Sequence, residues 1–355
     1  MIKSRLHPSE FVFNVGSSES PEHTWDEEDF KDKEKIGEGT YGEVWRVVWE
    51  ESNDTLALKE MKKEKMMKTG SKEIDSKKKK RAENELYALE KMKANPLFTR
   101  LYGWFESTES LYILMEYAPY DLYNLSESIA DSKAFNKERK QHCVGCVMTF
   151  EQMHAFGLAY CDLKDENILI DAEGRIKISD FGFVWKVKED GKATVPVGTL
   201  EFFAPELVKK TQDRTAPGFD EKVDMWALGA LAFSLRTGRT PFGTEKNKAA
   251  LFRNIVNNGN AFTVKYTGFS GPLTDLIKNC LLVNDPEKRY SAADLKDPEK
   301  VPFFKDVDWA SIAANNYEPA FVPKKNEERN RMQYCYKYQG EEKCIDKFIE
   351  KISKK

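Results

Sequence analysis

Three glycines near the start of the chain, in the stretch IGEGTYGEV from Ile36 to Val44, follow the spacing G-x-G-x-x-G. This spacing lets a backbone approach a phosphate closely, and several nucleotide-binding folds use it. A dinucleotide-binding fold needs a helix directly after the glycines. Here the next residues, EVWRVVWE, have the apolar, β-branched pattern of a strand. Gly37, Gly39 and Gly42 are therefore predicted to cap a β-hairpin that can fold over a nucleotide, although a plain surface hairpin is the alternative if the motif is taken alone.

The length and the net charge of the chain limit the classes of protein to which it can belong. Its 355 residues are enough for two modest domains or two lobes. A formal net charge of only −3 argues against a nucleic-acid binder driven by bulk charge. We find no apolar run long enough to span a bilayer and no signal-peptide core in the first residues. We therefore expect a soluble intracellular protein, in the cytoplasm or the nucleus, with no nucleic-acid partner.

The cysteines do not indicate a disulfide framework, because six in a chain of this length are too few. Cys143 and Cys146 form one CxxC in the stretch RKQHCVGCVMTFEQMH, which is predicted to be helical. A closed zinc site normally needs four ligands. Since neither a second CxxC nor a histidine cluster accompanies this pair, we expect both cysteines to pack within a helix.

The pattern of apolar residues changes along the chain. Residues 1–29 form a tail rich in Ser, Glu and Pro, and residues 30–117 read as strands around one helix, AENELYALEKMK. Residues 118–305 are mostly helical, with a hairpin predicted in NILIDAEGRIKISDFG because DAEG separates two apolar runs. Residues 306–355 are predicted to be irregular and polar, broken by Pro319 and Pro323.

Two charged residues are placed to hold phosphates. Lys59 lies on the strand that follows the glycine hairpin, and a buried amine needs a counter-charge. Glu85 lies on the predicted helix with Leu86, Leu89 and Met92, so its carboxylate is expected on the inward face. Taken singly, each is expected to be a solvated charge. Taken in this order, they make a phosphate clamp.

Several motifs follow in a fixed order. In YCDLKDENILI, Asp162 is placed to accept a hydroxyl proton, and Lys164 can neutralise charge on a transferred phosphoryl group. Asn167, and Asp180 in SDFG, supply the oxygen ligands that Mg²⁺ prefers. The stretches GTLEFFAPE, DMWALG and DPEKRYSAADL come next.

From Phe30 to Phe304, this ordered set resembles a eukaryotic protein kinase. The resemblance implies an α+β, bilobal fold with a β-rich N-lobe (30–117), a larger helical C-lobe (118–305), and ATP and Mg²⁺ as cofactors. It implies that Lys59 pairs with Glu85, that Asp162 is the catalytic base, and that Asn167 and Asp180 hold the metal. The remaining implied roles are a brace between Glu206 and Arg289, anchoring of the catalytic loop by Asp224, and substrate contacts by Glu166 and Thr199.

The resemblance also implies an ATP site. The glycine hairpin would cover the phosphates, with Tyr41 at its tip and Val44 against the base. Met115 matches the gatekeeper, Glu116 to Ala118 the adenine hinge and Asp121 the ribose contact. The implied ATP-binding residues are Ile36, Gly37, Glu38, Gly39, Thr40, Tyr41, Gly42, Val44, Ala57, Lys59, Met115, Glu116, Ala118, Asp121 and Leu169.

Lys164 in DLKDEN and Thr199 in GT resemble serine/threonine kinases. The stretches VPFFKDVDWASI and YEPAFVPK resemble the C-terminal tail of the AGC group, the relatives of cyclic-nucleotide-dependent and phosphoinositide-dependent kinases, so residues 306–355 are assigned to such a tail. A calcium/calmodulin-dependent or polo-like kinase is the nearest alternative. A pseudokinase that acts as a scaffold or binding module is the rival from another class, but none of its usual losses occurs at the Lys, Asp or metal-binding positions. A small-molecule kinase is disfavoured by GTLEFFAPE.

Three departures from the family concern regulation. The usual Arg before the catalytic Asp is Cys161, and the usual phosphorylated position three residues before Gly198 is Val195, with Thr194 one residue off register. The last residues lack a clear FxxF-type motif. Because the phosphate and its receptor are both missing, we expect activity that does not depend on phosphorylation of the activation segment, which would be held by packing of residues such as Phe183, Val184, Trp185 and Val197.

The basic run SKKKKR, Ser76 to Arg81, is placed just before the helix that carries Glu85. Its first interpretation is a solvated loop or helix start. The second is a contact between Lys77–Arg81 and a phosphopeptide or an anionic lipid. A monomer acting on protein substrates with Ser or Thr acceptors is the expected state.

Overall fold

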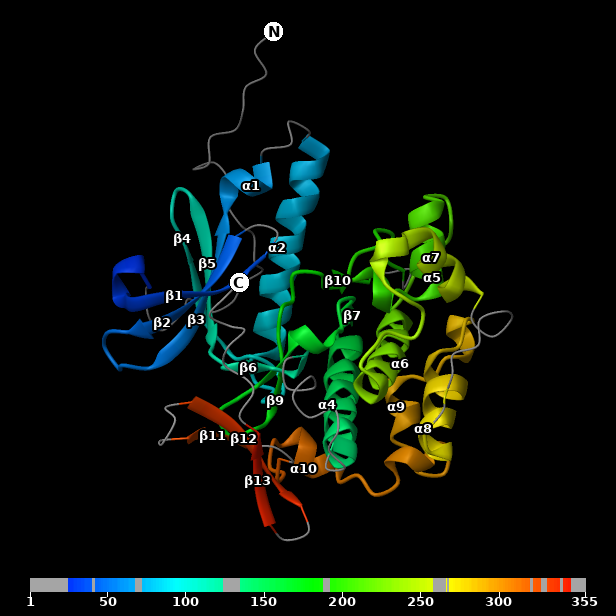
Figure 1. Ribbon diagram of the computed structural model, residues 1–355. Helices are drawn as coiled ribbons and strands as arrows, with labels where there is room; N and C mark the ends of the chain where they lie inside the picture. Colours follow the sequence, from blue (N-terminus) through cyan, green and yellow to red (C-terminus); the bar gives the residue numbers. More distant parts are fainter. Residues whose placement is uncertain are drawn as a thin grey trace. The chain divides into compact units, whose positions relative to one another are not determined.

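This computed structural model describes residues 25–39, 42–67, 72–123, 135–187, 192–257, 266, 268–319, 322–326, 331–338 and 341–345. Thr40, Tyr41, most of the N-terminal tail and the side chain of Lys77 lie outside the described residues, as do the predictions made for them. The chain divides into two compact units, Met1–Ala118 and Pro119–Lys355. Figure 1 labels the elements of both.

The N-terminal unit contains an antiparallel five-stranded sheet in the order β1-β2-β3-β5-β4. Among the described residues, the short helix α1 and one long helix, α2, accompany it, which confirms the expectation of one main helix. A short 3-10 turn, η2, precedes the sheet. The elements are η2 (Glu27–Asp29), β1 (Phe30–Glu38), β2 (Gly42–Trp49), β3 (Thr55–Lys62), α1 (Lys63–Met67), α2 (Lys72–Met92), β4 (Leu101–Glu106) and β5 (Ser110–Glu116).

The two faces of this sheet differ in character. Leu56 and Leu58 of β3 belong to a buried cluster with Tyr112 and Leu114 of β5, against which Trp25 packs. Successive side chains of a strand point to opposite faces. Ala57 and Lys59 therefore lie on the other face. This alternation removes Lys59 from the aromatic face and allows it to meet α2.

Gly42 is required by the approach of two strands. It pairs with Met61, and a Cβ at position 42 would lie 1.7 Å from the carbonyl oxygen of Glu60. A Cβ at Gly39, by contrast, would lie 4.0 Å from the carbonyl oxygen of Gly42, which is an ordinary van der Waals contact. The amide of Gly39 donates to that carbonyl at 2.9 Å, which closes the predicted hairpin. Gly42, the third glycine of the motif, is therefore explained by the close pairing of β2 with β3.

The basic run lies inside a helix, so its predicted place before the helix is wrong. α2 begins at Lys72, ahead of the run. Lys and Glu are good helix formers, and pairs three and four residues apart add support. Lys79 and Lys80 lie 4.0 and 3.7 Å from the carboxylate of Glu83. Lys78 donates to the carbonyl of Lys65 in α1 at 2.8 Å.

The C-terminal unit is mainly helical, with α4 and α6 packed together (Figure 1). The predicted hairpin is confirmed, because β8 and β9 pair antiparallel. The elements are β6 (Tyr120–Asp121), α4 (Phe135–Ala155), β7 (Leu158–Ala159), η3 (Asp165–Asn167), β8 (Ile168–Ile170), β9 (Ile176–Ile178), β10 (Trp185–Lys186), η4 (Leu200–Phe202), α5 (Pro205–Gln212), α6 (Lys222–Thr237), η5 (Glu245–Asn247), α7 (Lys248–Val256), α8 (Gly271–Asp275), the π-helix η6 (Leu276–Leu281), η7 (Pro286–Lys288), α9 (Ala292–Leu295), η8 (Pro302–Phe304) and α10 (Trp309–Ala313).

The expectation that the chain beyond residue 305 is irregular is wrong. After α10, three strands form an antiparallel sheet: β11 (Val322–Asn326), β12 (Arg331–Tyr338) and β13 (Glu341–Ile345). The signal was present in RMQYCYKY, where Met332, Tyr334, Tyr336 and Tyr338 alternate with other residues. Such a period of two favours a strand.

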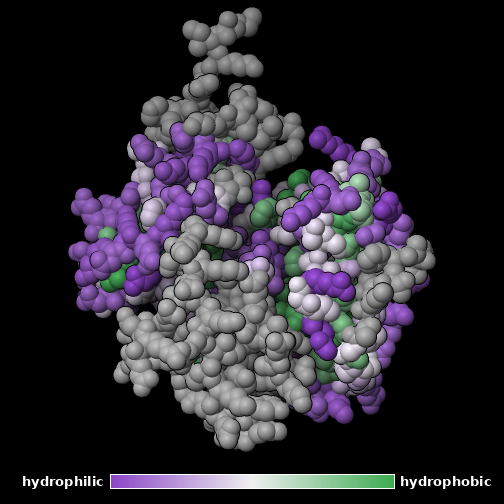
Figure 2. Space-filling view, viewed as in Figure 1, coloured by the Kyte–Doolittle hydropathy of each residue, from purple (hydrophilic) through white to green (hydrophobic). Residues whose placement is uncertain are grey.

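The described surface is largely hydrophilic in the view of Figure 2. Its exposed large hydrophobic side chains are Ile36, Tyr102, Tyr123 and Phe156. Of the helices that the structure describes, none has the length and apolar character needed to cross a membrane. Cys143 and Cys146 are buried in α4, as their helical pattern predicts.

We predict that Gly42→Ala destabilises the N-terminal unit, because its methyl group meets backbone that cannot move without distorting β3. The expected loss in free energy of unfolding is at least about 2 kcal/mol. Gly39→Ala is the matched control and should change stability by less than about 1 kcal/mol, since it has space and no positive φ. Urea titration followed by fluorescence measures both. Equal stability of the two variants would contradict the account of Gly42.

Candidate active site

A buried ion pair joins the sheet of the N-terminal unit to its long helix. Nζ of Lys59 lies 2.5 Å from Oε1 of Glu85, and the side chains are 15% and 2% exposed. A carboxylate this deeply buried is costly unless a cation compensates it. The pair therefore fixes the ammonium group of Lys59 at the centre of the sheet, and it is the contact that the sequence predicted.

Several other predicted nucleotide-binding residues of this unit share the face of Lys59. Val44 is the cross-strand partner of Lys59, and Met115 is the partner of Ala57. Directly opposite residues lie on the same face of a sheet. Gly37 pairs in turn with Val44. The structure thus brings these residues together on one face of the sheet, opposite the face that carries the buried cluster of Leu56, Leu58, Tyr112 and Leu114.

Other residues of the predicted ATP-binding set do not lie on this face, or their backbone already forms a hydrogen bond within the sheet. Ile36 is exposed near the end of β1 and Glu38 ends that strand. The amide of Glu116 donates to the carbonyl of Arg100 at 2.8 Å, so it already serves the sheet. Ala118, which follows β5, is buried. Leu169 of β8 and Asp121 of β6 are cross-strand partners in the C-terminal unit.

The carboxylate of Asp162 is held from two sides. Oδ1 accepts a hydrogen bond from the hydroxyl of Thr199 at 2.7 Å, and Oδ2 accepts one from the amide of Asn167 at 3.0 Å. Nζ of Lys164 lies 3.6 Å from Oδ2. Burial raises the pKa of the Asp162 carboxyl, while Lys164 and the bond from Thr199 act in the opposite direction. The result is an oriented carboxylate with a cation beside it.

Gly198 lets the segment that carries Thr199 reach this carboxylate. Its φ is +108°, and a Cβ there would lie 2.1 Å from the carbonyl oxygen of Cys161. Any side chain would push the segment away from the catalytic loop, the stretch YCDLKDEN from Tyr160 to Asn167. Thr199 can donate to Asp162 because the residue before it is glycine.

A buried aspartate at the start of α6 anchors the catalytic loop. Asp224 accepts hydrogen bonds from the amides of Tyr160 and Cys161, both at 2.8 Å. Nε2 of His154 lies 2.9 Å from Oδ2 of the same carboxylate. Cys161 adopts a φ of +66°, a strained conformation for a residue with a side chain. Asp224 is thus the group that stabilises this turn.

Asn167 and Asp180 fit a magnesium site by their chemistry. The Asn167 amide nitrogen donates to the carbonyl and the carboxylate of Asp162, at 2.9 and 3.0 Å, which leaves the amide oxygen as its acceptor. The amide of Ser179, next to Asp180, donates to the Asn167 carbonyl at 3.0 Å and so brings the two residues together. Carboxylate and amide oxygens are the ligands that Mg²⁺ prefers.

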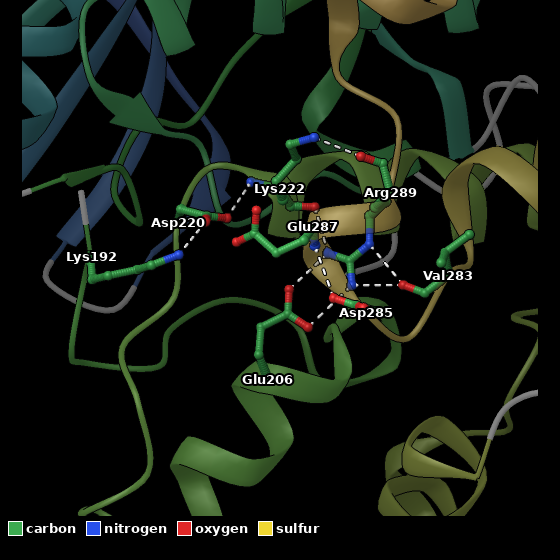
Figure 3. A network of polar contacts seen from close by, with 8 residues as sticks. All are labelled: Lys192, Glu206, Asp220, Lys222, Val283, Asp285, Glu287 and Arg289. Carbon is green, nitrogen blue, oxygen red and sulfur yellow. Dashed lines mark hydrogen bonds and ion pairs between the residues drawn. The ribbon is translucent and has the colours of Figure 1, made fainter. Parts of the chain in front are cut away.

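A bidentate ion pair lies within the C-terminal unit (Figure 3). Nη1 and Nη2 of Arg289 lie 2.7 and 3.2 Å from the two carboxylate oxygens of Glu206. Arg289 also donates to the carbonyls of Val283 and Lys222. Its guanidinium is fully buried, so these bonds offset the cost of removing its charge from water.

Acidic residues cluster beside the catalytic loop. Glu166 lies in η3, and Asp121 lies in β6, which packs against η3. Asp165, between Lys164 and Glu166, was not singled out from the sequence. Burial, with the neighbouring Glu166 carboxyl, raises the pKa of Asp165 to about 7. The sequence signal was simply three consecutive polar residues, which does not reveal which one is buried.

The structure describes the activation segment, Asp180 to Glu206, except for residues 188–191. Val184 and Val197 are buried, whereas Phe183 and Trp185 are half-buried. Thr194 is exposed, and Cys161 is buried, which raises the pKa of its thiol. Two residues that the sequence analysis did not single out, Lys192 and Asp220, form an ion pair here. They are 28 residues apart, so no local pattern links them.

Comparison with known proteins agrees with this geometry. A family model described as the protein kinase domain matches residues 30–300. The chain is 31% identical over 301 residues to serine/threonine-protein kinase N2 of Danio rerio, covering 83% of this chain and 29% of that protein. It is 29% identical over 325 residues to serine/threonine-protein kinase SCH9 of Candida albicans, covering 91% and 38%.

Protein kinase C of Drosophila melanogaster is 26% identical over 319 residues, covering 89% of this chain and 41% of that protein. The chain thus spans less than half the length of each of these three relatives. The family model, however, covers most of the chain. The chain therefore belongs to the protein kinase domain family.

Proposed function

We propose that the chain transfers the γ-phosphoryl group of ATP to Ser or Thr hydroxyls of protein substrates. The observation that carries this proposal is the buried Asp162 carboxylate, held at once by Thr199 and Asn167. A carboxylate fixed in this way is suited to orient an attacking hydroxyl and to accept its proton. Phosphoryl transfer requires mainly positioning and charge stabilisation from the protein.

Each residue of the proposed site has a separate task. Asp162 orients the acceptor hydroxyl, and Lys164 beside it neutralises charge on the transferred group. Lys59, fixed by Glu85, binds the α- and β-phosphates. Asn167 and Asp180 would hold Mg²⁺, which when bound neutralises the charge of the phosphate oxygens. Glu206, Arg289 and Asp224 contact no reactant and act by positioning.

The rival function is a pseudokinase that serves as a scaffold or binding module. Every charged position that phosphoryl transfer uses is present in this chain, and the Lys59–Glu85 pair is formed. The departure at Cys161 does not remove a group that touches the reactants. These observations favour the active enzyme.

The experiment that tests the proposal is incubation of the purified chain with Mg·ATP and an arrayed peptide library. We expect transfer to Ser and Thr, and abolition of transfer in Asp162→Asn, which keeps the shape of the side chain but removes its charge. Lys59→Met should lower the rate at least ~100-fold, because a preorganised cation is lost. A wild-type protein that binds ATP but phosphorylates nothing would favour the pseudokinase.

We also propose a preference for basic residues N-terminal to the acceptor. Asp121 and Glu166, on the contacting elements β6 and η3, provide the negative charge. The same peptide library measures this preference. Strong selection for proline or acidic residues beside the acceptor would contradict it.

The regulation that we propose follows from Cys161. A phosphate on the activation segment is normally bound by an Arg at this position, in a charge-assisted contact that a thiol cannot make. Val195 cannot carry a phosphate at the usual register. We therefore propose that the unphosphorylated chain is already substantially active.

In the cell, we propose a monomeric cytoplasmic enzyme. A contact of Lys77–Arg81 with a phosphopeptide or an anionic lipid stays a prediction; Lys78, Lys79 and Lys80 also contact groups within the N-terminal unit.

We predict that phosphatase treatment leaves the initial rate nearly unchanged, because Cys161 stands where relatives have the Arg that binds the phosphate. Mass spectrometry confirms that the segment is bare, and Thr194→Ala serves as the matched variant. A fall of more than about tenfold in either sample, equivalent to roughly 1.4 kcal/mol of barrier, would mean that a phosphate switch persists.

A further inference from the structure

The activation segment is attached to the chain just before α6 by backbone and side-chain contacts that involve no phosphate. Ala193 and Phe219 form an antiparallel bridge, with N–O distances of 2.6 Å and 2.9 Å in the two directions. Both residues are buried. Gly218 permits this approach, because a Cβ at that position would lie 2.5 Å from the Ala193 carbonyl oxygen.

An ion pair lies directly beside this bridge. Nζ of Lys192 donates to Oδ2 of Asp220, and the two side chains are 39% and 15% exposed. The hydrogen bond to Asp220 raises the pKa of Lys192, so the amine stays charged. The other oxygen of Asp220 accepts a hydrogen bond from the amide of Lys222 at 3.0 Å, which fixes the carboxylate at the start of α6.

The same carboxylate belongs to a longer polar network (Figure 3). Nζ of Lys222 donates to the carbonyl of Arg289 at 2.6 Å, and Nη1 of Arg289 donates to the carbonyl of Lys222 at 2.7 Å. Arg289 binds Glu206, which lies at the other end of the activation segment. The network thus connects Lys192, on one side of Gly198 and Thr199, to Glu206 on the other.

We propose that Lys192 and Asp220 are positioning residues that hold the activation segment in its working conformation in place of a phosphate and its receptor arginine. Thr194 and Val195 follow the anchored Ala193 directly, so the anchor lies where the family's phosphate would act. Holding this point keeps Gly198 and Thr199 docked against Cys161 and Asp162. This inference rests on the proposed kinase activity without phosphorylation, and it names the contacts responsible.

The test is a double-mutant cycle with Lys192→Met, Asp220→Asn and the double variant. Asp220→Asn keeps an oxygen for the amide of Lys222, and Lys192→Met keeps an unbranched apolar chain. The matched control is Lys288→Ala. It breaks a Lys–Asp pair whose side chains are 78% and 49% exposed, at a distance of 3.7 Å. Pairs so exposed contribute little.

Initial rates are measured on the phosphatase-treated chain with one peptide substrate. Each single variant should lower kcat/KM for the peptide by roughly threefold to tenfold, and the double variant by no more than either single one, because the two groups act as one contact. The KM for ATP and the melting temperature should stay close to wild type. Lys288→Ala should match wild type in all of these.

Single variants within twofold of wild type, or a double variant whose losses multiply, would overturn the inference. A loss of kcat/KM that is accompanied by a clear fall in the melting temperature would also overturn the inference, since the pair would then only stabilise the fold. A wild-type chain inactive when bare would instead refute the proposed function. The two failures are therefore distinguishable, because the wild-type rate is measured first.

Discussion

The catalytic loop depends on one buried carboxylate. Asp224 is fully buried, and removing a carboxylate from water costs several kcal/mol unless hydrogen bonds replace the solvent. The amides of Tyr160 and Cys161 and the ring of His154 supply those bonds. In return, the carboxylate holds Cys161 in a left-handed conformation that it would not adopt by itself. Asp162 follows directly, so the geometry of the proposed base is set by a residue that never touches a substrate.

The second constraint is close approach of backbone at glycines. Gly198 brings the activation segment against Cys161, and Gly218 brings it against the chain before α6. At the second of these points, Ala193 is bridged to Phe219, and Lys192 beside it is paired with Asp220. The segment is therefore held by its backbone at two places and by charge at one. In a chain with Cys161 in place of the usual arginine, we propose that these contacts provide the order that a phosphate would otherwise supply.

Much of the fold and of the site could be predicted from the sequence, because the relevant signals are local. The strand after Gly42, the hairpin at residues 171–174 and the inward face of Glu85 each follow from a short periodic pattern. The start of α2 was missed because a run of lysines suggests a solvated loop as readily as a helix. The C-terminal sheet does not follow from the sequence as plainly, because Pro319 and Pro323 favour an irregular chain while the alternation in RMQYCYKY favours a strand.

The contacts that the sequence could not give are non-local and lack a periodic pattern. Lys192 and Asp220 belong to polar stretches in which any charged residue could be solvated. Nothing in the local pattern shows that Asp165 is buried while Glu166 beside it is exposed. Likewise, the packing of Gly42 against Glu60 is visible only when the two strands are paired.

Hydrogen exchange of the dephosphorylated chain, resolved to single residues, tests the central claim most directly. Backbone amides in stable hydrogen bonds exchange slowly, while those of unanchored segments exchange near the rate of a free peptide. If the activation segment is anchored without phosphate, the amides of Ala193 and Phe219 should be protected at least ~100-fold in the bare protein, and Lys192→Met should reduce that protection. Exchange of both amides at the free-peptide rate in the unphosphorylated chain would contradict the account.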